Sequence, residues 1–130
     1  MNPPLFDATV PAFTRALRAL DTCLDKAQVH AETVGFDITT LFAARLAPDM
    51  FPLGRQIQIA CDFAKGVSAR LAGADMPNFE DTETTLAEYK ARIANTVAFI
   101  QTLPADAFAG AESREIVIMR KDTKREYTGL

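Results

Sequence analysis

The chain has 130 residues, the length of one domain, and 14 Lys and Arg against 17 Asp and Glu give it a net charge of −3. A composition of 48% hydrophobic and 24% charged residues excludes a disordered tail, and two cysteines are too few for a secreted disulfide scaffold. There is no basic excess to neutralise phosphates and no run of about 20 apolar residues. We therefore expect no nucleic-acid partner and no membrane partner.

The first predicted element is a long helix from about Asp7 to Val34, with Pro11 in its first turn and Gly35 as its stop. Its apolar residues recur at alternating steps of three and four, which is typical of a helix that buries one narrow seam. At about 1.5 Å per residue this helix is roughly 40 Å long, so we expect an elongated molecule. The seam consists of Val10, Phe13, Leu17, Leu20, Leu24, Ala27 and Ala31.

A short helical turn is predicted within residues 36–46, and a second long helix from about Met50 to Ala72. This second helix has two apolar stripes, which indicates neighbours on two sides and a central position. The first stripe is Leu53, Ile57, Ala60, Ala64, Val67 and Leu71; the second is Ile59, Phe63 and Gly66, with Gln56 in line.

A third helix is predicted from about Thr82 to Leu103, with Asp81 or Thr82 as its cap, although Thr85 and Glu88 also have the spacing of a capping box. Its core face is Leu86, Tyr89, Ile93, Val97 and Ile100. We expect six residues of the three helices to share one core, because their spacings place them on facing stripes: Leu17, Leu20, Ile57, Val67, Ile93 and Val97.

The last part of the chain changes to the pattern of a β-hairpin. Residues 115–119 are short and β-branched, residues 121–124 are expected to form the turn, and residues 125–128 the returning strand. The basic residues around this turn alternate with acidic ones, which favours a solvated turn over a binding patch. A lone hairpin is marginally stable, so it must pack against the helices.

The most distinctive run is Arg45–Leu53, with the letters RLAPDMFPL. It is followed in order by residues 55–60, 64–66, 69–73, 79–83 and 114–116. Together these runs resemble an uncharacterised, mostly bacterial family, the domain of unknown function numbered nineteen-ninety-three, which is grouped with the DinB/YfiT-like four-helix proteins. The resemblance implies a mainly α, up-down helical bundle of the DinB-like type, with three long helices and a short C-terminal β-hairpin, in one domain over residues 1–130.

The resemblance also implies a further aromatic- and His-containing helix after Thr128-Gly129, which this chain lacks. A bundle without that helix has an uncovered apolar groove, and such grooves invite a partner. We therefore expect a homodimer, closed by two-fold symmetry. A fourth helix encoded beyond this sequence would fill the same groove.

The wider superfamily often binds a divalent metal through three histidines, one near the second long helix and two on the last. This chain has one histidine, His30, near the end of the first helix, where a surface or capping role is expected. Phe63 lies where a histidine of the second helix would fall, and a phenyl ring binds no metal. We therefore expect no metal site and no cofactor in these residues.

Four polar residues are candidates to line a pocket: Asp49, Arg55, Gln56 and Asp62. Asp62 shares a helix face with Gln58 and Lys65, and the Asp62–Lys65 spacing predicts a solvated ion pair. Gln56 lies in line with apolar residues, so it either lines a pocket or ties down the Pro48–Pro52 loop.

Catalytic residues cannot be assigned, because Cys23 and Cys61 lack a neighbouring signal that would lower a thiol pKa, and no nucleophile, phosphate-loop or metalloprotease motif occurs. Buried reduced thiols and the lack of a signal-peptide pattern at the N-terminus favour a cytoplasmic protein. Two functions remain open. One is a dimerising or small-ligand-binding module; the other is a DinB-like metal-dependent thiol transferase or hydrolase whose ligands lie in a C-terminal helix absent from this chain.

Overall fold

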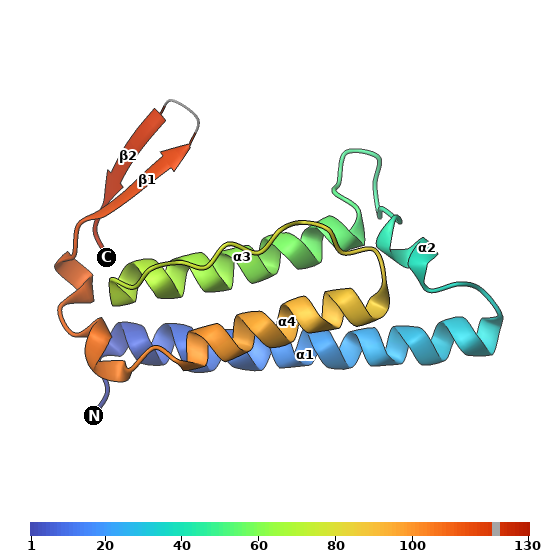
Figure 1. Cartoon of the computed structure of the whole chain (residues 1–130), viewed down its shortest axis with the longest axis horizontal. Coiled ribbons are helices and arrows are strands. Elements are labelled where there is room, and N and C mark those ends of the chain that lie inside the picture. The colour runs from blue at the N-terminus through green and yellow to red at the C-terminus, as the bar shows by residue number, and fades with distance from the viewer. Residues whose placement is uncertain (121–122) are drawn as a thin grey trace.

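Helix α1 spans Pro4–Val34 and runs the length of the molecule in the computed structural model, which describes residues 1–120 and 123–130 (Figure 1). It begins three residues earlier than expected because Pro4 fits the first turn, where no backbone donor is needed. Pro11 therefore lies two turns inside the helix, which forfeits one backbone hydrogen bond there. Gly35 ends the helix in the left-handed conformation (φ 91°), and its N–H donates to the Ala31 carbonyl.

Helix α3 spans Leu53–Ala72 and packs antiparallel to α1 after a connection that contains the one-turn helix α2, Thr39–Phe42 (Figure 1). It begins three residues later than expected because Pro52 has an extended backbone (ψ 157°) that precedes the first turn. Near this end Gly54 lets α4 approach closely, since a Cβ at this position would overlap the hydroxyl of Tyr89.

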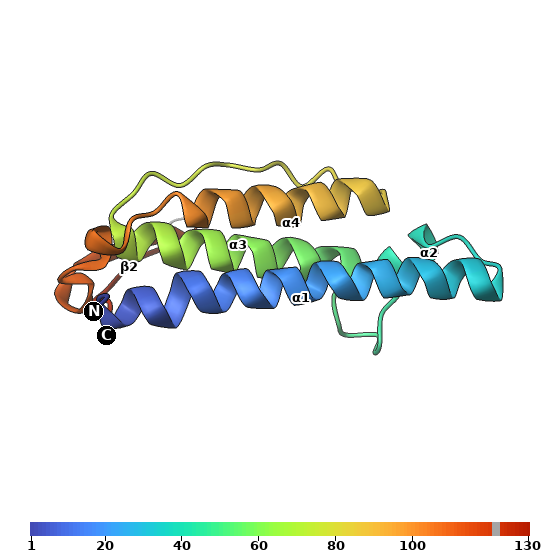
Figure 2. The same ribbon diagram turned by 90° about the horizontal axis from the view of Figure 1, so that it is seen from below.

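Residues 73–85, which we call the strap, run back over the seam between α3 and α4 without helix or strand (Figures 1 and 2). Helix α4, Leu86–Gln101, consequently starts at the same end of the bundle as α3 and runs parallel to it. The up-down alternation thus holds for α1 and α3, and the strap replaces a short turn before α4.

The expected cap of α4 at Asp81 or Thr82 is wrong. Thr85 caps the helix instead, because its hydroxyl accepts the Glu88 N–H at 3.2 Å while the Glu88 carboxylate accepts the Thr85 N–H. This reciprocal capping box shortens α4 to 16 residues and leaves Asp81 and Glu83 in the strap.

Two single-turn 3₁₀ helices, η1 (Ala105–Phe108) and η2 (Ala111–Ser113), lead into the hairpin of β1 (Ile116–Arg120) and β2 (Thr123–Tyr127). The strands are antiparallel, with Ile116 opposite Tyr127 and Arg120 opposite Thr123. The expected hairpin is therefore confirmed, but Thr123 and Lys124 belong to β2. The other expected turn residues, Lys121 and Asp122, lie outside the described residues.

The core consists of two clusters along the bundle instead of the single one expected. The first joins α1, α2, α3 and α4, and the second joins the N-terminal part of α1, the C-terminal parts of α3 and α4, and the 3₁₀ helices. Leu20 and Val67 are half-buried, and Val67 packs on the second cluster. The first cluster includes Leu17, Leu24, Ile57, Ile93 and Val97; the second includes Val10, Leu71, Ile100, Leu103 and Phe108.

The second apolar stripe expected on α3 is buried at Gly66, but Ile59 is half-buried and Phe63 is 69% exposed. No helix among the described residues is long and apolar enough to cross a membrane.

Candidate functional site

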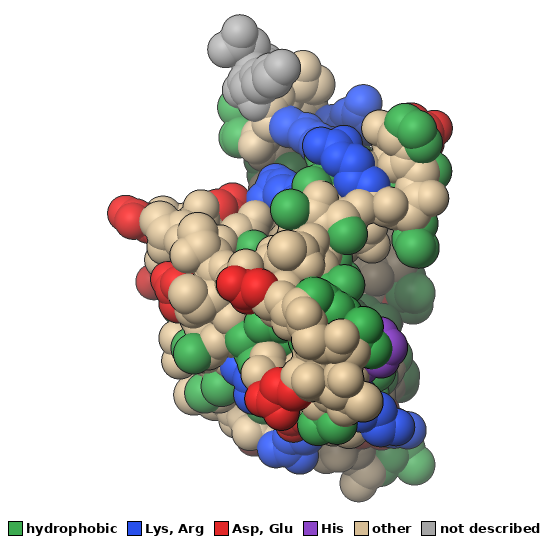
Figure 3. Space-filling model, turned by 90° about the vertical axis from the view of Figure 1, so that its right-hand side faces the viewer, with side chains coloured by type: hydrophobic (Ala, Val, Ile, Leu, Met, Phe, Trp, Pro, Cys, Tyr) green, Lys and Arg blue, Asp and Glu red, His purple; other side chains and the backbone are tan. Residues whose placement is uncertain are grey.

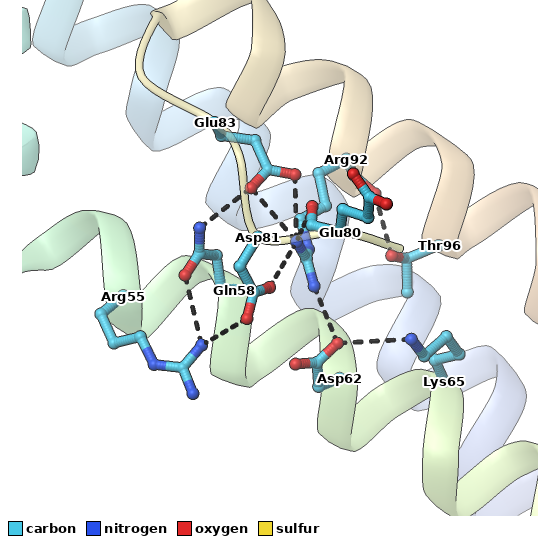
Figure 4. Close-up of polar contacts among 9 residues, drawn as sticks. All are labelled: Arg55, Gln58, Asp62, Lys65, Glu80, Asp81, Glu83, Arg92 and Thr96. Atoms are coloured by element: carbon cyan, nitrogen blue, oxygen red, sulfur yellow. Dashed lines mark hydrogen bonds and ion pairs between the residues drawn. The ribbon is translucent and has the colours of Figure 1, made fainter. Parts of the chain in front are cut away.

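A network of charged side chains joins α3, α4 and the strap around the buried Arg92 (Figure 4). Its side chain is 1% exposed. Nη1 donates to both Glu83 carboxylate oxygens, at 3.0 and 3.1 Å, and lies 2.8 Å from Asp81 Oδ1. Nη2 donates to Asp62 Oδ1 at 2.9 Å. Arg92 therefore connects two carboxylates of the strap to one of α3.

The backbone of the strap contributes to the same network. Arg92 Nη1 lies 3.1 Å from the carbonyl oxygen of Glu80, which fixes the main chain of the strap as well as its side chains. A planar guanidinium suits this arrangement because its donors form a rigid fork that several acceptors can share.

A second layer of contacts surrounds the carboxylates that bind Arg92 (Figure 4). Gln58 donates to Glu83 Oε2 at 2.9 Å and accepts from Arg55 Nη1 at 3.3 Å. The same Arg55 nitrogen pairs with Asp81 Oδ2 at 3.0 Å. Gln58 is buried, so its amide needs both partners.

Lys65 completes the network at the far side of Asp62. Its ammonium lies 3.4 Å from Asp62 Oδ1 and 4.9 Å from the ring centre of Phe79, a strap residue, in a cation–π contact. The expected Asp62–Lys65 pair is present, but it is solvated on one side alone, because Asp62 is 42% exposed whereas the Lys65 side chain is 7% exposed.

The charges of the network cancel, since Arg55, Lys65 and Arg92 face the carboxylates of Asp62, Asp81 and Glu83. Burial lowers the pKa of Arg92, but the hydrogen bonds that it donates to Glu83 and Asp62 outweigh this effect and raise that pKa overall. Every carboxylate is thus bound to a permanent cation. The arrangement holds the strap and offers no free acid or base.

Cys61 is buried on α3 beside this network, and burial raises the pKa of its thiol, against the opposing effects of Thr96 and Arg92. A raised pKa keeps the sulfur protonated and weakly nucleophilic at neutral pH. Cys23, expected to be buried, is exposed on α1.

The four candidate pocket residues separate in the structure. Arg55 and Asp62 enter the Arg92 network, whereas Asp49 is exposed in the loop before α3. Gln56 is exposed as well, and its Nε2 donates to the Phe51 carbonyl at 2.8 Å, which ties down the loop before α3.

Arg92, Asp81 and Glu83 were missed as site residues. Buried positions on α4 recur at Tyr89, Arg92/Ile93, Thr96/Val97 and Ile100, so Arg92 and Thr96 lie in the apolar stripe at helical spacing. A charged residue within such a stripe signals a buried ion pair.

The residues described do not fit the metal implied by the superfamily. His30 is exposed near the end of α1, where its ring packs 5.8 Å from that of Phe36, and Figure 3 shows the histidine at the surface of that end. Over residues 1–120 and 123–130, no group of three or more His, Cys, Asp or Glu side chains could hold a metal ion.

Comparison with known proteins gave one family match and a similar solved structure. Residues 5–130 match the family model described as a domain of unknown function, DUF1993. The chain belongs to this family. It is also similar to the crystal structure of a DinB family member protein from Shewanella denitrificans, with 38% identity and a TM-score of 0.89. That match covers 96% of this chain and 71% of the other chain. A search of curated proteins found no match.

Proposed function

We propose that this DUF1993 chain is a cytoplasmic, non-enzymatic helical-bundle module that associates with a second copy of itself. The observation that carries the proposal is the 69% exposure of Phe63 in the middle of α3. Ile59 and Val67, one turn before and one turn after it, are half-buried on the same side of the helix. An exposed aromatic ring within an apolar row is typical of a surface that another protein covers.

A second copy suits this surface because the row carries no charge. Gln56 and Ala60 are exposed beside Phe63, and neither would repel the same surface of another copy. A two-fold axis that passes near Phe63 would cover both rings at once.

Size measurements on the purified chain test self-association. We expect light scattering to give a dimer for the wild type and a monomer for Phe63→Glu, since a buried carboxylate opposite its own copy is strongly unfavourable. Met119→Glu is the matched control, because Met119 is 63% exposed on the hairpin. A wild-type monomer at high concentration, or a dimeric Phe63→Glu variant, would contradict the proposal.

The cytoplasmic part of the proposal is supported by the thiols. Cys23 and Cys61 are both free, and Cys23 is exposed, a combination that suits a reducing compartment. Fractionation of the native host, with antibodies against the chain, tests this assignment.

The metal-dependent thiol transferase or hydrolase remains the alternative function, but none of its ligands can be assigned to the described residues. A second candidate function, binding of a small molecule, has an observation in its favour. A groove lined by apolar and basic side chains lies between α1 and α4, on another side of the bundle from the Phe63 row.

A further inference from the structure

The groove between α1 and α4 consists of two adjoining hollows. One has a volume of about 290 Å³, and its apolar wall comes from Ile93, Ala94, Val97 and Ala98 of α4. The other lies toward the N-terminus of α1, against Val10 and Pro11. Arg18 and Gln101 line both hollows, so the two form one continuous surface, which we call the α1–α4 groove.

The groove has an apolar half and a cationic half. Arg15 and Arg18 both line the second hollow, and neither forms an ion pair with any residue that the structure describes. Asp21, the acidic residue of the first hollow, pairs with Lys90 at 3.0 Å, an ammonium that it shares with Asp25. Two guanidinium groups are thus available to an anion.

A buried hydroxyl group lies in the cationic half. Thr14 is 7% exposed, and its Oγ1 has no hydrogen-bond partner among the described residues. A buried hydroxyl without a partner costs free energy, and about 90% or more of buried polar groups have one. Thr14 lines the same hollow as Arg15 and Arg18, so a ligand oxygen there would provide the missing partner.

We propose that the α1–α4 groove binds a small monocarboxylate with a short apolar chain. The carboxylate pairs with Arg15 and Arg18 and accepts the Thr14 hydroxyl, while the chain packs on Ile93 and Val97. Arginine suits a carboxylate because its fork of N–H donors matches the two oxygens. A hollow of about 290 Å³ is at the lower limit for ligand pockets, which favours a chain of about six carbons. This inference rests on the small-molecule candidate function above.

Titrations of the full chain with three matched compounds, followed by amide chemical shifts, separate the inference from that candidate function. The probes are hexanoate, hexanol and hexylamine, which share a chain and differ in charge. We expect hexanoate to bind at least tenfold more tightly than the other two and to shift amides of α1 and α4. Equal binding of hexanol would overturn carboxylate recognition but retain a ligand groove. No binding of any probe would overturn both.

Variants test the assigned residues. Arg18→Gln and Arg15→Gln are each expected to weaken hexanoate binding at least tenfold, whereas Lys26→Gln, an exposed cation elsewhere on α1, leaves it unchanged. Thr14→Val removes a hydroxyl that has no partner among residues 1–120 and 123–130, so we expect weaker hexanoate binding and undiminished thermal stability. An unchanged affinity in both arginine variants would overturn the proposal.

Discussion

Two cations of α4, Lys90 and Arg92, are two residues apart and hold together different parts of the molecule. Lys90 faces α1, where it pairs with Asp21 and Asp25, and its side chain remains 29% exposed. Arg92 faces α3 and the strap, where it pairs with three carboxylates at 1% exposure. Both bind several acids from distant segments, so the main difference between the two sites is access of water.

That difference determines what each contact contributes. Removing one member of a buried ion pair leaves an unpaired charge in the interior and destabilises by about 3–5 kcal/mol. An exposed pair is screened by water and salt and contributes about 0.2–1 kcal/mol. Arg92 therefore determines where the strap lies. Lys90 adds little to the stability of the contact between α1 and α4, which apolar residues already hold together.

The largest expected effect is that of Arg92→Ala. It leaves Glu83, which is 10% exposed, without its cation, and we expect a loss of about 3–5 kcal/mol in the free energy of unfolding measured with urea. The packing around Arg92 should also loosen, so the neighbouring buried Cys61 should become reactive toward a thiol reagent under native conditions.

Arg92→Lys is the control for this prediction. It keeps the charge but loses the fork of donors that reaches Asp62, Asp81 and Glu83 together, so an intermediate loss is expected. If Arg92→Ala lowers the free energy of unfolding no more than the loss of an exposed ion pair does, the contrast between Arg92 and Lys90 does not hold.

Ile93→Ala gives the apolar reference for the same stretch of α4. Ile93 is 2% exposed in the first core cluster, and its truncation leaves a cavity that we expect to cost about 2–5 kcal/mol. Cys61 should stay protected here, because the contacts of Arg92 are intact. A loss below about half a kcal/mol would remove Ile93 from the core.

Thr85→Ala tests whether the end of the strap depends on local capping as well as on Arg92. Loss of the capping box is expected to cost about 1 kcal/mol in urea unfolding. The Thr85 hydroxyl lowers the pKa of Glu88, so the contribution of this carboxylate is present at neutral pH and is lost as pH falls through that lowered pKa. As the pH is lowered, the free energy of unfolding should therefore fall more steeply for the wild type than for the variant.

The smallest effect is expected for Lys90→Ala, about 0.2–1 kcal/mol at low salt. Hydrogen bonding to Asp25 raises the pKa of Lys90, so whatever stability it adds is lost only as pH rises through this raised value. The difference from wild type should shrink in 1 M salt. If Lys90→Ala lowers the free energy of unfolding as much as Arg92→Ala does, solvent exposure does not explain the difference between the two sites.

The helices and the hairpin could be predicted from the sequence because their signals are local. Gly35 and Gly73 end α1 and α3 where expected, and the β-branched run at residues 116–118 forms a strand. The start of α4 could not be settled in this way. Thr85 caps the helix in place of Thr82 because Arg92 holds residues 80–83 in the strap. Arg92 follows its strap partners Glu83 and Glu80 by 9 and 12 residues, so this is not a local signal.

The candidate site could be predicted only in part. Arg55 and Asp62 were singled out as candidate pocket residues of α3, but Arg92, which binds Asp62, lies 30 residues beyond it on another helix. The parallel course of α4 brings Arg92 to Asp62, and no pattern within either helix records that pairing. The exposure of Phe63 was missed for a related reason, since periodicity gives an apolar face without saying whether anything covers it.

The strap also has a consequence for the order in which the chain folds. The connection between α1 and α3, residues 35–52, turns the chain at one end of the bundle and brings the two helices together antiparallel. Parallel α4 instead reaches its place only after the 13 residues of the strap have run back along the bundle. The contacts of Arg92 with the strap close short loops, but its contact with Asp62 requires α4 to be docked. The network thus closes late, after most apolar surface is buried. We expect Arg92 variants to accelerate unfolding strongly and to slow refolding little, so this buried cation sets the lifetime of the folded state more than the speed of reaching it.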